Sequence, residues 1–316
     1  MNVSLIGFGK AGRELYNELV TNELVKSINV YDPNPTRFSS NIFQGSPKTV
    51  FSSSSFQFED STDLLVIASP DHRHKQYLAE AIHRDIPSFV EKPFVTSYAE
   101  LEEIKNLLGS NPSYQSTSNL ILRSAPLYQK VKELFASGRF GPKVFIEGKY
   151  LYGRWEKIVN GWRGHKDYSV VLGGLIHIID LACYLTDDYK YKVELHRHRI
   201  TSREPNDVLD FSQVSLASSE TGFFSLTTSF STNVEHRRDL AIYGDNAWIE
   251  IKGDEVRFEV SKLPELENLS PNPVSKGALL SEFISHLNGQ SKDDGCFPTI
   301  REVLYVMDLC LGKSTY

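Results

Sequence analysis

The sequence predicts an α/β fold for residues 1–120 and an α+β fold for residues 121–316. Strand-like and helix-like segments alternate up to about residue 120, which is typical of a parallel sheet covered by helices. Beyond that point, long alternating strands follow one another with short turns, which is typical of a large, mostly antiparallel sheet with one open face. A chain of 316 residues also has the usual length of two domains.

The composition is that of an ordinary globular protein, with 40% hydrophobic and 23% charged residues. The net charge of −6 provides no basic surface for nucleic acid. The three cysteines lie far apart and predict neither a disulfide framework nor a metal site, so a reducing, cytoplasmic location is expected. No apolar run approaches the roughly 18 residues that span a membrane, so no membrane partner is expected.

The first domain shows a βαβ pattern within its first 32 residues. Strands are expected at residues 2–7, 28–32, 64–68 and 86–90. Helices are expected behind the first, third and fourth strands, beginning near Ala11, at His74 and after a capping box at residues 97–100. No helix is placed between residues 33 and 63, and the serine run at 52–55 predicts a loop or a frayed strand.

The second domain opens with a helical stripe from Leu127 to Phe135, which Gly138 closes. Strands are expected at residues 143–152, 191–200, 211–218, 222–230, 240–243, 248–252 and 256–260. A helix from Gly174 to Tyr184 interrupts them, and helices at 278–287 and 300–311 close the chain. An uncovered apolar sheet face is a surface for association, so a homodimer or homotetramer is expected.

A glycine-rich turn lies between the first strand and the first helix. The expected cofactor-binding residues of this turn are Gly7, Phe8, Gly9, Lys10, Ala11 and Gly12. The first glycine permits a tight turn, the second lets the backbone approach a diphosphate, and the third lets the helix pack on the strand. The diphosphate would bind the free N–H groups at the start of the helix. The pattern predicts a Rossmann-type dinucleotide-binding domain; the alternative is a glycine-rich turn that binds nothing.

Asp32 stands 20 residues after Gly12, at the end of the second expected strand. There it would accept hydrogen bonds from the hydroxyls of an adenosine ribose. A carboxylate repels a 2′-phosphate, which favours NAD as the cofactor. Arg37 could pair with such a phosphate, or it could be an ordinary solvated arginine. NAD is therefore expected, with NADP as the alternative.

Ala68-Ser-Pro-Asp-His-Arg-His74 followed by Glu91-Lys-Pro93 resembles the Gfo/Idh/MocA oxidoreductases, the family of glucose–fructose oxidoreductase and inositol dehydrogenase. The resemblance extends along essentially the whole chain, including Arg123-Ser-Ala-Pro126 and His177-Ile-Ile-Asp180. It implies a Rossmann domain, a C-terminal sheet domain, and hydride transfer to or from a sugar or cyclitol carbon. It also adds residues to the expected cofactor site, namely Ser69, Pro70, His74, Glu91 and Lys92.

Lys92 is the first catalytic candidate. It ends an expected parallel strand, at the edge of the sheet where ligands bind, and Pro93 restricts its backbone. Its ammonium group could stabilise the substrate oxygen while hydride leaves the carbon, or transfer a proton if burial lowers its pKa. The alternative is a surface lysine at the end of a strand.

His177 is the second catalytic candidate. In the first turn of a helix from Gly174, the positive helix end would keep its imidazole neutral and available as a base. The resemblance implies that this histidine is the acid/base of the reaction. A core histidine bonded to backbone is the alternative.

The sequence departs from the family pattern just before His177. Family members often carry an aspartate four residues earlier, where this chain has Gly173, and a glycine two residues earlier, where it has Leu175. Either the lysine and the histidine suffice, or another group takes the place of the aspartate. The upstream residues 165–167, His-Lys-Asp, could supply that group or could form a solvated loop.

Five residues are the substrate-binding candidates: Arg123, Tyr152, Trp162, Arg163 and Asp180. Aromatic rings stack on sugars, and arginines pair with carboxylates or phosphates, although ordinary packing would use the same residue types. The sequence thus predicts an NAD(P)-dependent oxidoreductase acting on a sugar hydroxyl or carbonyl, with a nucleotide-linked or acidic sugar as its substrate and no metal. An NAD-assisted glycosidase or lyase and a non-catalytic NAD- or sugar-binding regulatory protein are the alternatives.

Overall fold

A computed structural model describes residues 1–38, 46, 48–153, 155, 163, 168–200, 202, 209–229, 235–290 and 296–315. The chain forms two compact units. The first unit comprises residues 1–121 and 275–304, and the second comprises residues 122–274 and 305–316. The first contains a parallel sheet and the second a mixed, mostly antiparallel sheet, which confirms the predicted fold class.

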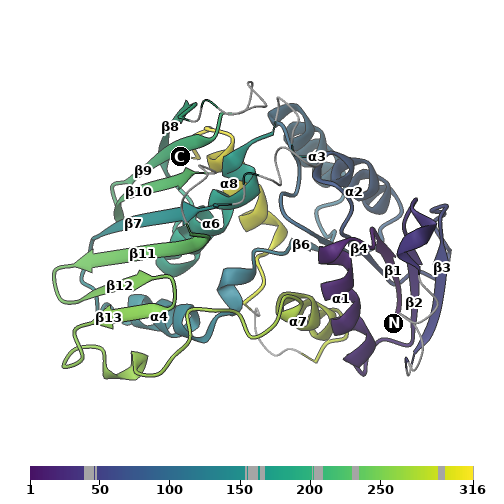
Figure 1. The fold of residues 1–316 in the computed structure, drawn as a ribbon, viewed down its shortest axis with the longest axis horizontal. Coiled ribbons are helices and arrows are strands. Elements are labelled where there is room, and N and C mark those ends of the chain that lie inside the picture. The colour runs from purple at the N-terminus through teal and green to yellow at the C-terminus, as the bar shows by residue number, and fades with distance from the viewer. Residues whose placement is uncertain are drawn as a thin grey trace. The chain divides into compact units, whose positions relative to one another are not determined.

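The first unit is built on a six-stranded parallel sheet in the order β3-β2-β1-β4-β5-β6 (Figure 1). Its strands are β1 (Asn2–Ile6), β2 (Ser27–Tyr31), β3 (Thr49–Ser53), β4 (Leu64–Ile67), β5 (Ser88–Val90) and β6 (Ser116–Ser118). The strand order reverses between β1 and β4, and ligands of such sheets bind at the carboxyl ends of the strands beside this point. The serine-rich stretch does contain a strand, because the backbone of β3 pairs with β2 along its whole length.

Helices α1 (Lys10–Thr21), α2 (His74–His83) and α3 (Tyr98–Ser110) belong to the first unit. α1 follows the glycine turn directly and buries Leu15, Tyr16 and Leu19. The expected capping box of α3 is present: Ser97 Oγ accepts a hydrogen bond from Glu100 N at 3.3 Å. The Glu100 carboxylate reaches back to Thr96 N at 2.8 Å, one residue before the one a capping box uses.

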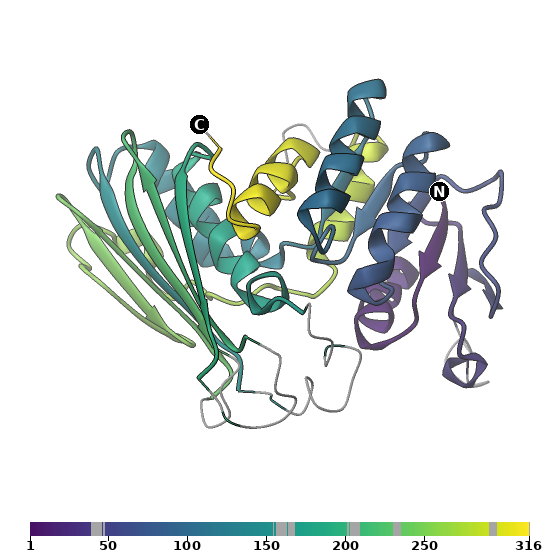
Figure 2. The ribbon, with the colours of Figure 1, turned by 90° about the horizontal axis from the view of Figure 1, so that it is seen from above.

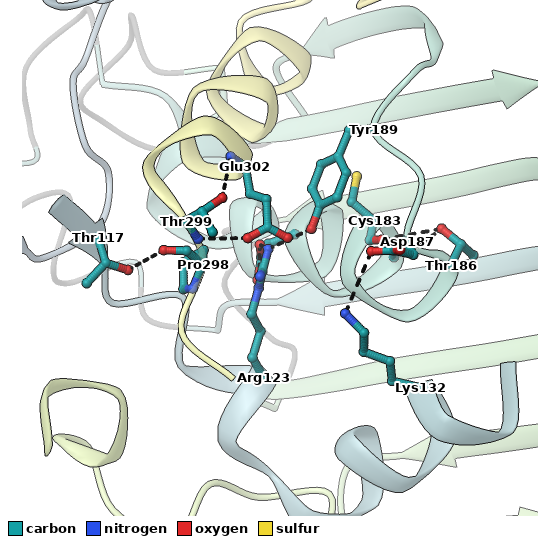
Figure 3. Close-up of polar contacts among 12 residues, drawn as sticks. Thr117, Arg123, Lys132, Cys183, Thr186, Asp187, Tyr189, Pro298, Thr299 and Glu302 are labelled. Atoms are coloured by element: carbon teal, nitrogen blue, oxygen red, sulfur yellow. Dashed lines mark hydrogen bonds and ion pairs between the residues drawn. The ribbon is translucent and has the colours of Figure 1, made fainter. Parts of the chain in front are cut away.

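The C-terminal helix α7 (Ala278–Leu287) contributes to the core of the first unit. The residues of that shared core include Val3, Leu5, Leu15, Leu279, Leu280, Phe283 and Ile284. Thr117 also donates a hydrogen bond to Pro298 O at 2.6 Å (Figure 3). Residues 275–304 therefore belong to the first unit, whereas the sequence predicted that all of 121–316 form one domain. Helical periodicity identifies the apolar face of α7 but not the sheet on which that face packs.

The second unit contains a seven-stranded sheet in the order β13-β12-β11-β7-β10-β9-β8. Its strands are β7 (Val144–Leu151), β8 (Lys192–His198), β9 (Phe211–Ser218), β10 (Gly222–Ser229), β11 (Arg237–Gly244), β12 (Trp248–Lys252) and β13 (Glu255–Phe258). The pair β7–β10 is parallel, whereas the other neighbouring strands are antiparallel.

Helices α4 (Pro126–Ala136) and α6 (Ile176–Thr186) pack together in the second unit, and α6 lies against the sheet (Figure 2). Gly148 of β7 allows a close approach, because a Cβ atom there would lie 2.4 Å from Ile178 Cγ2 of α6. On the opposite face of the sheet, Phe145, Phe223 and Tyr243 are exposed on three adjacent strands. The ring of Phe145 stacks on the other two at centroid distances of 6.1 and 6.2 Å.

The helix that carries His177 begins earlier than the sequence predicts. A π-helical turn, η5 (Val171–Leu175), runs directly into α6, and helical backbone already starts at residue 170. His177 therefore lies about two turns into the continuous helix rather than in its first turn. The expectation that the positive helix end keeps its imidazole neutral is wrong, because that effect is confined to the first turn.

The chain ends with α8 (Ile300–Cys310). It starts with a second capping box, in which Thr299 N donates to Glu302 Oε2 at 2.7 Å and Glu302 N to Thr299 Oγ1 at 3.3 Å (Figure 3). Within the described ranges, no helix has both the length and the apolar character that crossing a bilayer requires.

We expect Leu280→Ala to destabilise the first unit, since Leu280 is fully buried in its core. The cost is roughly 2–5 kcal/mol for removing a buried leucine side chain. Amide hydrogen exchange should show faster exchange in β1 and α1, with little change in β9 and β10. The control is Val274→Ala, at a residue that is 81% exposed. Faster exchange confined to the second unit would contradict the assignment of α7 to the first.

Candidate active site

The glycine turn closes tightly against the sheet. Gly7 has φ of 92°, in the region that favours glycine, and a Cβ atom there would lie 2.4 Å from Ala68 O. A Cβ atom on Gly12 would lie 1.9 Å from Gly7 O. Both positions therefore require glycine, and the start of α1 comes against the end of β1 as dinucleotide binding demands.

Asp32 is buried and holds this turn from the end of β2. Its Oδ2 accepts hydrogen bonds from Phe8 N and from Arg37 Nη1, both at 2.7 Å. Its Oδ1 accepts one from Asn34 N at 2.9 Å. Arg37 is thus an ion-pair partner of Asp32, with 42% of its side chain exposed. The carboxylate already organises the turn, and a ribose would have to share it with these donors.

A cavity of about 490 Å³ lies beside the turn. The residues that line it are Phe8, Gly9, Lys10, Arg13, Glu14, Asn17 and Arg37. Phe8 offers its backbone, since its side chain is buried in the core, whereas Lys10, Arg13 and Arg37 provide positive charge. A glycine cradle at a helix start with three cationic side chains fits the diphosphate part of NAD.

The carboxyl ends of β4, β5 and β6 carry a second group of polar residues. Ser69 and Pro70 follow β4, Lys92 follows β5, and Asn119 follows β6. Ser69 Oγ and Asn119 Oδ1 are buried and, within the described part of the chain, accept or donate no hydrogen bond. Buried polar atoms in that state are suited to a polar ligand. Lys92 is half-buried here, and its bond to Pro93 is cis.

The side chain of Glu91 connects the ends of β5 and β6. Its Oε1 accepts a hydrogen bond from Asn119 Nδ2 at 2.6 Å. Burial raises the pKa of the Glu91 carboxyl, although that hydrogen bond and the charges of Lys92 and His74 act in the opposite direction. The carboxylate of Glu91 thus already has a partner at this edge, and its contact with a cofactor remains a prediction.

His74 joins the loops after β4 and β5. It is 0% exposed, and its Nδ1 lies 2.7 Å from Pro93 O while its Nε2 lies 2.8 Å from Ser69 O. Both partners are backbone carbonyl oxygens, so the ring connects the two loops through its two nitrogens. The sequence placed His74 among the cofactor-binding residues. The structure instead buries it as a link between two backbone segments that do reach the edge.

In the second unit, His177 lies among aromatic rings. It is 8% exposed and stacks on Tyr150 of β7 at a centroid distance of 6.2 Å. Tyr150 also stacks on Tyr152 at 5.9 Å, and His236 packs edge-on against both tyrosines. Tyr152, a predicted substrate residue, is itself buried, so it contributes to this aromatic cluster.

Arg123 and Asp180 form a buried ion pair, which corrects the prediction that both bind substrate. Arg123 is 1% exposed and Asp180 0%. Arg123 Nε and Nη2 donate to Asp180 Oδ1 at 3.0 and 2.6 Å. Arg123 Nη2 also donates to Tyr189 Oη at 3.1 Å, and both of these residues are labelled in Figure 3. Such fully buried groups present no surface to a ligand. The pair ties η3 (Ile121–Ser124) to α6, one turn beyond His177.

The buried cysteines of this unit offer no nucleophile. Burial raises the pKa of the Cys183 and Cys310 thiols well above the ordinary value, and the charge of Asp180 acts in the same direction. Within the described ranges, no group of three His, Cys, Asp or Glu residues could hold a metal ion. Trp162 and the upstream residues 165–167 lie outside the described residues, whereas Arg163 is described and half-buried.

Comparison with known proteins decides the family. A model of an oxidoreductase family with an NAD-binding Rossmann fold matches residues 1–114, and a model of the GFO/IDH/MocA C-terminal domain matches residues 128–250. The chain belongs to the Gfo/Idh/MocA oxidoreductase family. Its first unit is thereby an NAD-binding Rossmann domain, as the glycine turn predicts.

The similar proteins of known function are distant. Inositol 2-dehydrogenase from Rubrobacter xylanophilus is 22% identical over 202 residues, which are 61% of this chain and 56% of that protein. Inositol 2-dehydrogenase 2 from Saccharopolyspora erythraea is 25% identical over 191 residues, 58% of this chain and 53% of its own. The matches thus span little more than half the length of these curated relatives.

Solved structures share the fold over nearly the whole chain. The WlbA dehydrogenase from Bordetella pertussis, in complex with NADH and UDP-GlcNAcA, has a TM-score of 0.78 and 16% identity, covering 99% of this chain and 94% of its own. The myo-inositol 2-dehydrogenase from Lactobacillus plantarum has a TM-score of 0.79 and 15% identity, covering 98% and 95%. At this identity the likeness concerns the fold.

The sequence analysis missed two residues of these sites. Asn119 follows β6, and no strand was expected at residues 116–118, so the rule that selected Lys92, a polar residue at the carboxyl end of a parallel strand, could not select it. Tyr150 lies in the last two residues of β7 and stacks on His177. No sequence spacing shows this contact, because packing brings β7 and α6 together.

We expect His74→Phe to destabilise the first unit, because it removes both ring nitrogens that contact the carbonyls of Ser69 and Pro93. A cost of roughly 2–5 kcal/mol for two such groups would lower the melting temperature by roughly 5–10 °C. Calorimetric melting curves measure this shift. Gln76→Ala, at an exposed position of the same helix, should stay within about 0.5 kcal/mol of the wild type. Equal curves for both variants would contradict the role of His74.

Proposed function

We propose that this protein is an NAD-dependent dehydrogenase or reductase that acts on a CH–OH group of a sugar or sugar derivative. The observation that carries the proposal is the carboxyl edge of the six-stranded sheet, where Lys92 and the buried polar atoms of Ser69 and Asn119 follow successive strands. Inositol dehydrogenases and a dehydrogenase bound to UDP-GlcNAcA among the similar proteins support a polyol or nucleotide-linked acidic sugar as the substrate class.

Each catalytic residue has one task in this proposal. Bound NAD supplies the hydride acceptor for oxidation of the substrate carbon. Lys92 Nζ binds the substrate oxygen and stabilises its developing negative charge. An imidazole nitrogen of His177 takes the proton of the substrate hydroxyl and returns it in the reductive direction. Arg163 and Trp162 remain the proposed substrate contacts, whereas Arg123 and Asp180 are excluded by their burial.

The open face of the second sheet supports the proposed homo-oligomer. Phe145, Phe223 and Tyr243 form an exposed, stacked row across β10, β7 and β11. Exposed apolar rows of this kind mark association surfaces in proteins. A second copy of the same chain is the proposed partner, through the same face in both copies.

The proposal is tested by turnover of Lys92→Ala. We expect kcat to fall by about a thousandfold or more, because the charge that stabilises the oxyanion is lost. NAD binding, measured by calorimetry, should stay within a few-fold of the wild type. Absorbance of NADH is followed over a panel of polyols and nucleotide-linked sugars, with Lys26→Ala, an exposed lysine of the same unit, as the control.

Three outcomes would contradict the dehydrogenase. Lys92→Ala turning over within twofold of the wild type removes the role of the lysine. Release of free sugar without net NADH indicates an NAD-assisted glycosidase or lyase. Tight NAD binding without turnover over the whole panel indicates a regulatory binding protein.

The preference for NAD over NADP depends on the charge of Asp32 in this proposal. We expect Asp32→Asn to lower the ratio of the NADP dissociation constant to the NAD dissociation constant by about tenfold. The reason is that the repulsion of a 2′-phosphate is removed while Arg37 remains. Calorimetric titrations with both cofactors measure this ratio. Asp60→Asn, which removes an exposed charge from the same unit, should leave it unchanged. A wild type that binds NADP more tightly than NAD would reverse the assignment.

A further inference from the structure

The phenol of Tyr168 lies where the side chain of residue 173 would begin. A Cβ atom on Gly173 would be 1.9 Å from Tyr168 Oη and 2.7 Å from its Cζ. A residue with a Cβ atom at position 173 would require this phenol to move. The glycine therefore admits the tyrosine, whose hydroxyl, as the atom nearest to that position, is directed at the helix.

Helix geometry directs the side chain of His177 toward the surface around Gly173. Gly173 belongs to η5 and His177 to the first turn of α6, four residues further on. Residues four apart are neighbours on one helix face, and helical side chains tilt toward the N-terminus. The imidazole thus extends over the turn that contains Gly173.

The ring of Tyr150 supports this direction independently. A Cβ atom on Gly174 would lie 2.6 Å from Tyr150 Cδ1, so this ring is pressed against the π-helical turn. The same ring stacks on His177 at 6.2 Å with an interplanar angle of 26°. One ring can contact both residues because the imidazole reaches back to this turn. Two adjacent glycines therefore admit two tyrosines to the helix surface on which His177 lies.

We propose that Tyr168 is a positioning residue for His177, with its hydroxyl placed to hold the imidazole in one orientation. A phenol hydroxyl can both donate and accept a hydrogen bond, so it serves the imidazole in either protonation state. Tyr168 keeps its own proton; the proton of the substrate hydroxyl goes to His177. The effect on turnover rests on the proposed function, whereas the proposed contact between Tyr168 and His177 does not.

Three other titratable groups in the described part of this unit have contacts of their own. Tyr150 presents its ring face to the imidazole, and His236 packs edge-on against Tyr150. Asp180, one turn further along α6, is committed to Arg123. Tyr168 is the group whose polar tip lies against the turn that precedes His177.

The decisive variant is Tyr168→Phe, which removes the hydroxyl and keeps the ring. In the protein without ligands, the imidazole NMR signals of His177, identified by their loss in His177→Gln, should shift. Tyr98→Phe, at an exposed tyrosine of the first unit, should leave them in place. Unchanged His177 signals in Tyr168→Phe would overturn the proposal. This measurement needs no turnover, so its result is independent of whether the protein is a dehydrogenase.

In turnover, Tyr168→Phe should lower kcat by about tenfold to a hundredfold, the usual scale of a group that supports a general base. KM for NAD should stay within about twofold, because the cofactor residues are untouched. A purely structural tyrosine would give an unchanged kcat or a parallel loss of NAD affinity and melting temperature, and either result counts against the proposal.

A double variant tests the shared space. Gly173→Asp alone should be poorly active, because its Cβ would collide with the phenol, and Tyr168→Ala alone should lack the polar group. Combined, they place a carboxylate acceptor in the vacated space, where it can orient the imidazole. We expect the double variant to exceed Tyr168→Ala in kcat by about tenfold. A double variant no faster than Tyr168→Ala would show that a polar group at this point does not support His177.

Discussion

Close approach at glycine is the constraint on which both sites depend. In the first unit, the absence of Cβ atoms at Gly7 and Gly12 lets the start of α1 and the loop after β4 close on the end of β1. In the second, Gly148 lets α6 approach β7, and Gly173 and Gly174 let two tyrosine rings reach the helix that carries His177. At each of these glycines a neighbouring segment or ring lies where a methyl group would exclude it.

Buried polar groups then hold these positions. Asp32 ties the glycine turn to β2 and to Arg37, and His74 ties the loop after β4 to the loop after β5. The Arg123–Asp180 pair anchors α6 from within the second unit. Breaking such pairs is costly because the remaining partner stays buried without compensation. These buried polar contacts hold the backbone around the sites in place. A residue that matches a family motif can therefore act without touching a ligand.

The sequence predicts the fold class and the cofactor turn well, because both depend on local periodicity and on spacing within a few residues. The strands β9 and β12 have the predicted bounds, and the glycines, Asp32 and Lys92 all lie at carboxyl ends of parallel strands. The prediction for the start of the His177 helix was wrong, since a π-helical turn that buries all five of its residues has no amphipathic pattern to mark it. Arg123 and Asp180 were misassigned because a charged side chain gives no local sign that its partner is buried with it.

The amino-acid sequence by itself determined that the chain forms two units and carries an NAD-binding turn. Both conclusions depend on strand and helix periods and on glycine spacing, which can be recognised within short segments. Tertiary structure alone decided that α7 completes the core of the first unit and that His74 bonds two backbone carbonyls. It also decided that Tyr168 fills the space left at Gly173. These arrangements depend on which surfaces meet after the chain has folded, and no pattern of residue types along one segment specifies its partner in another.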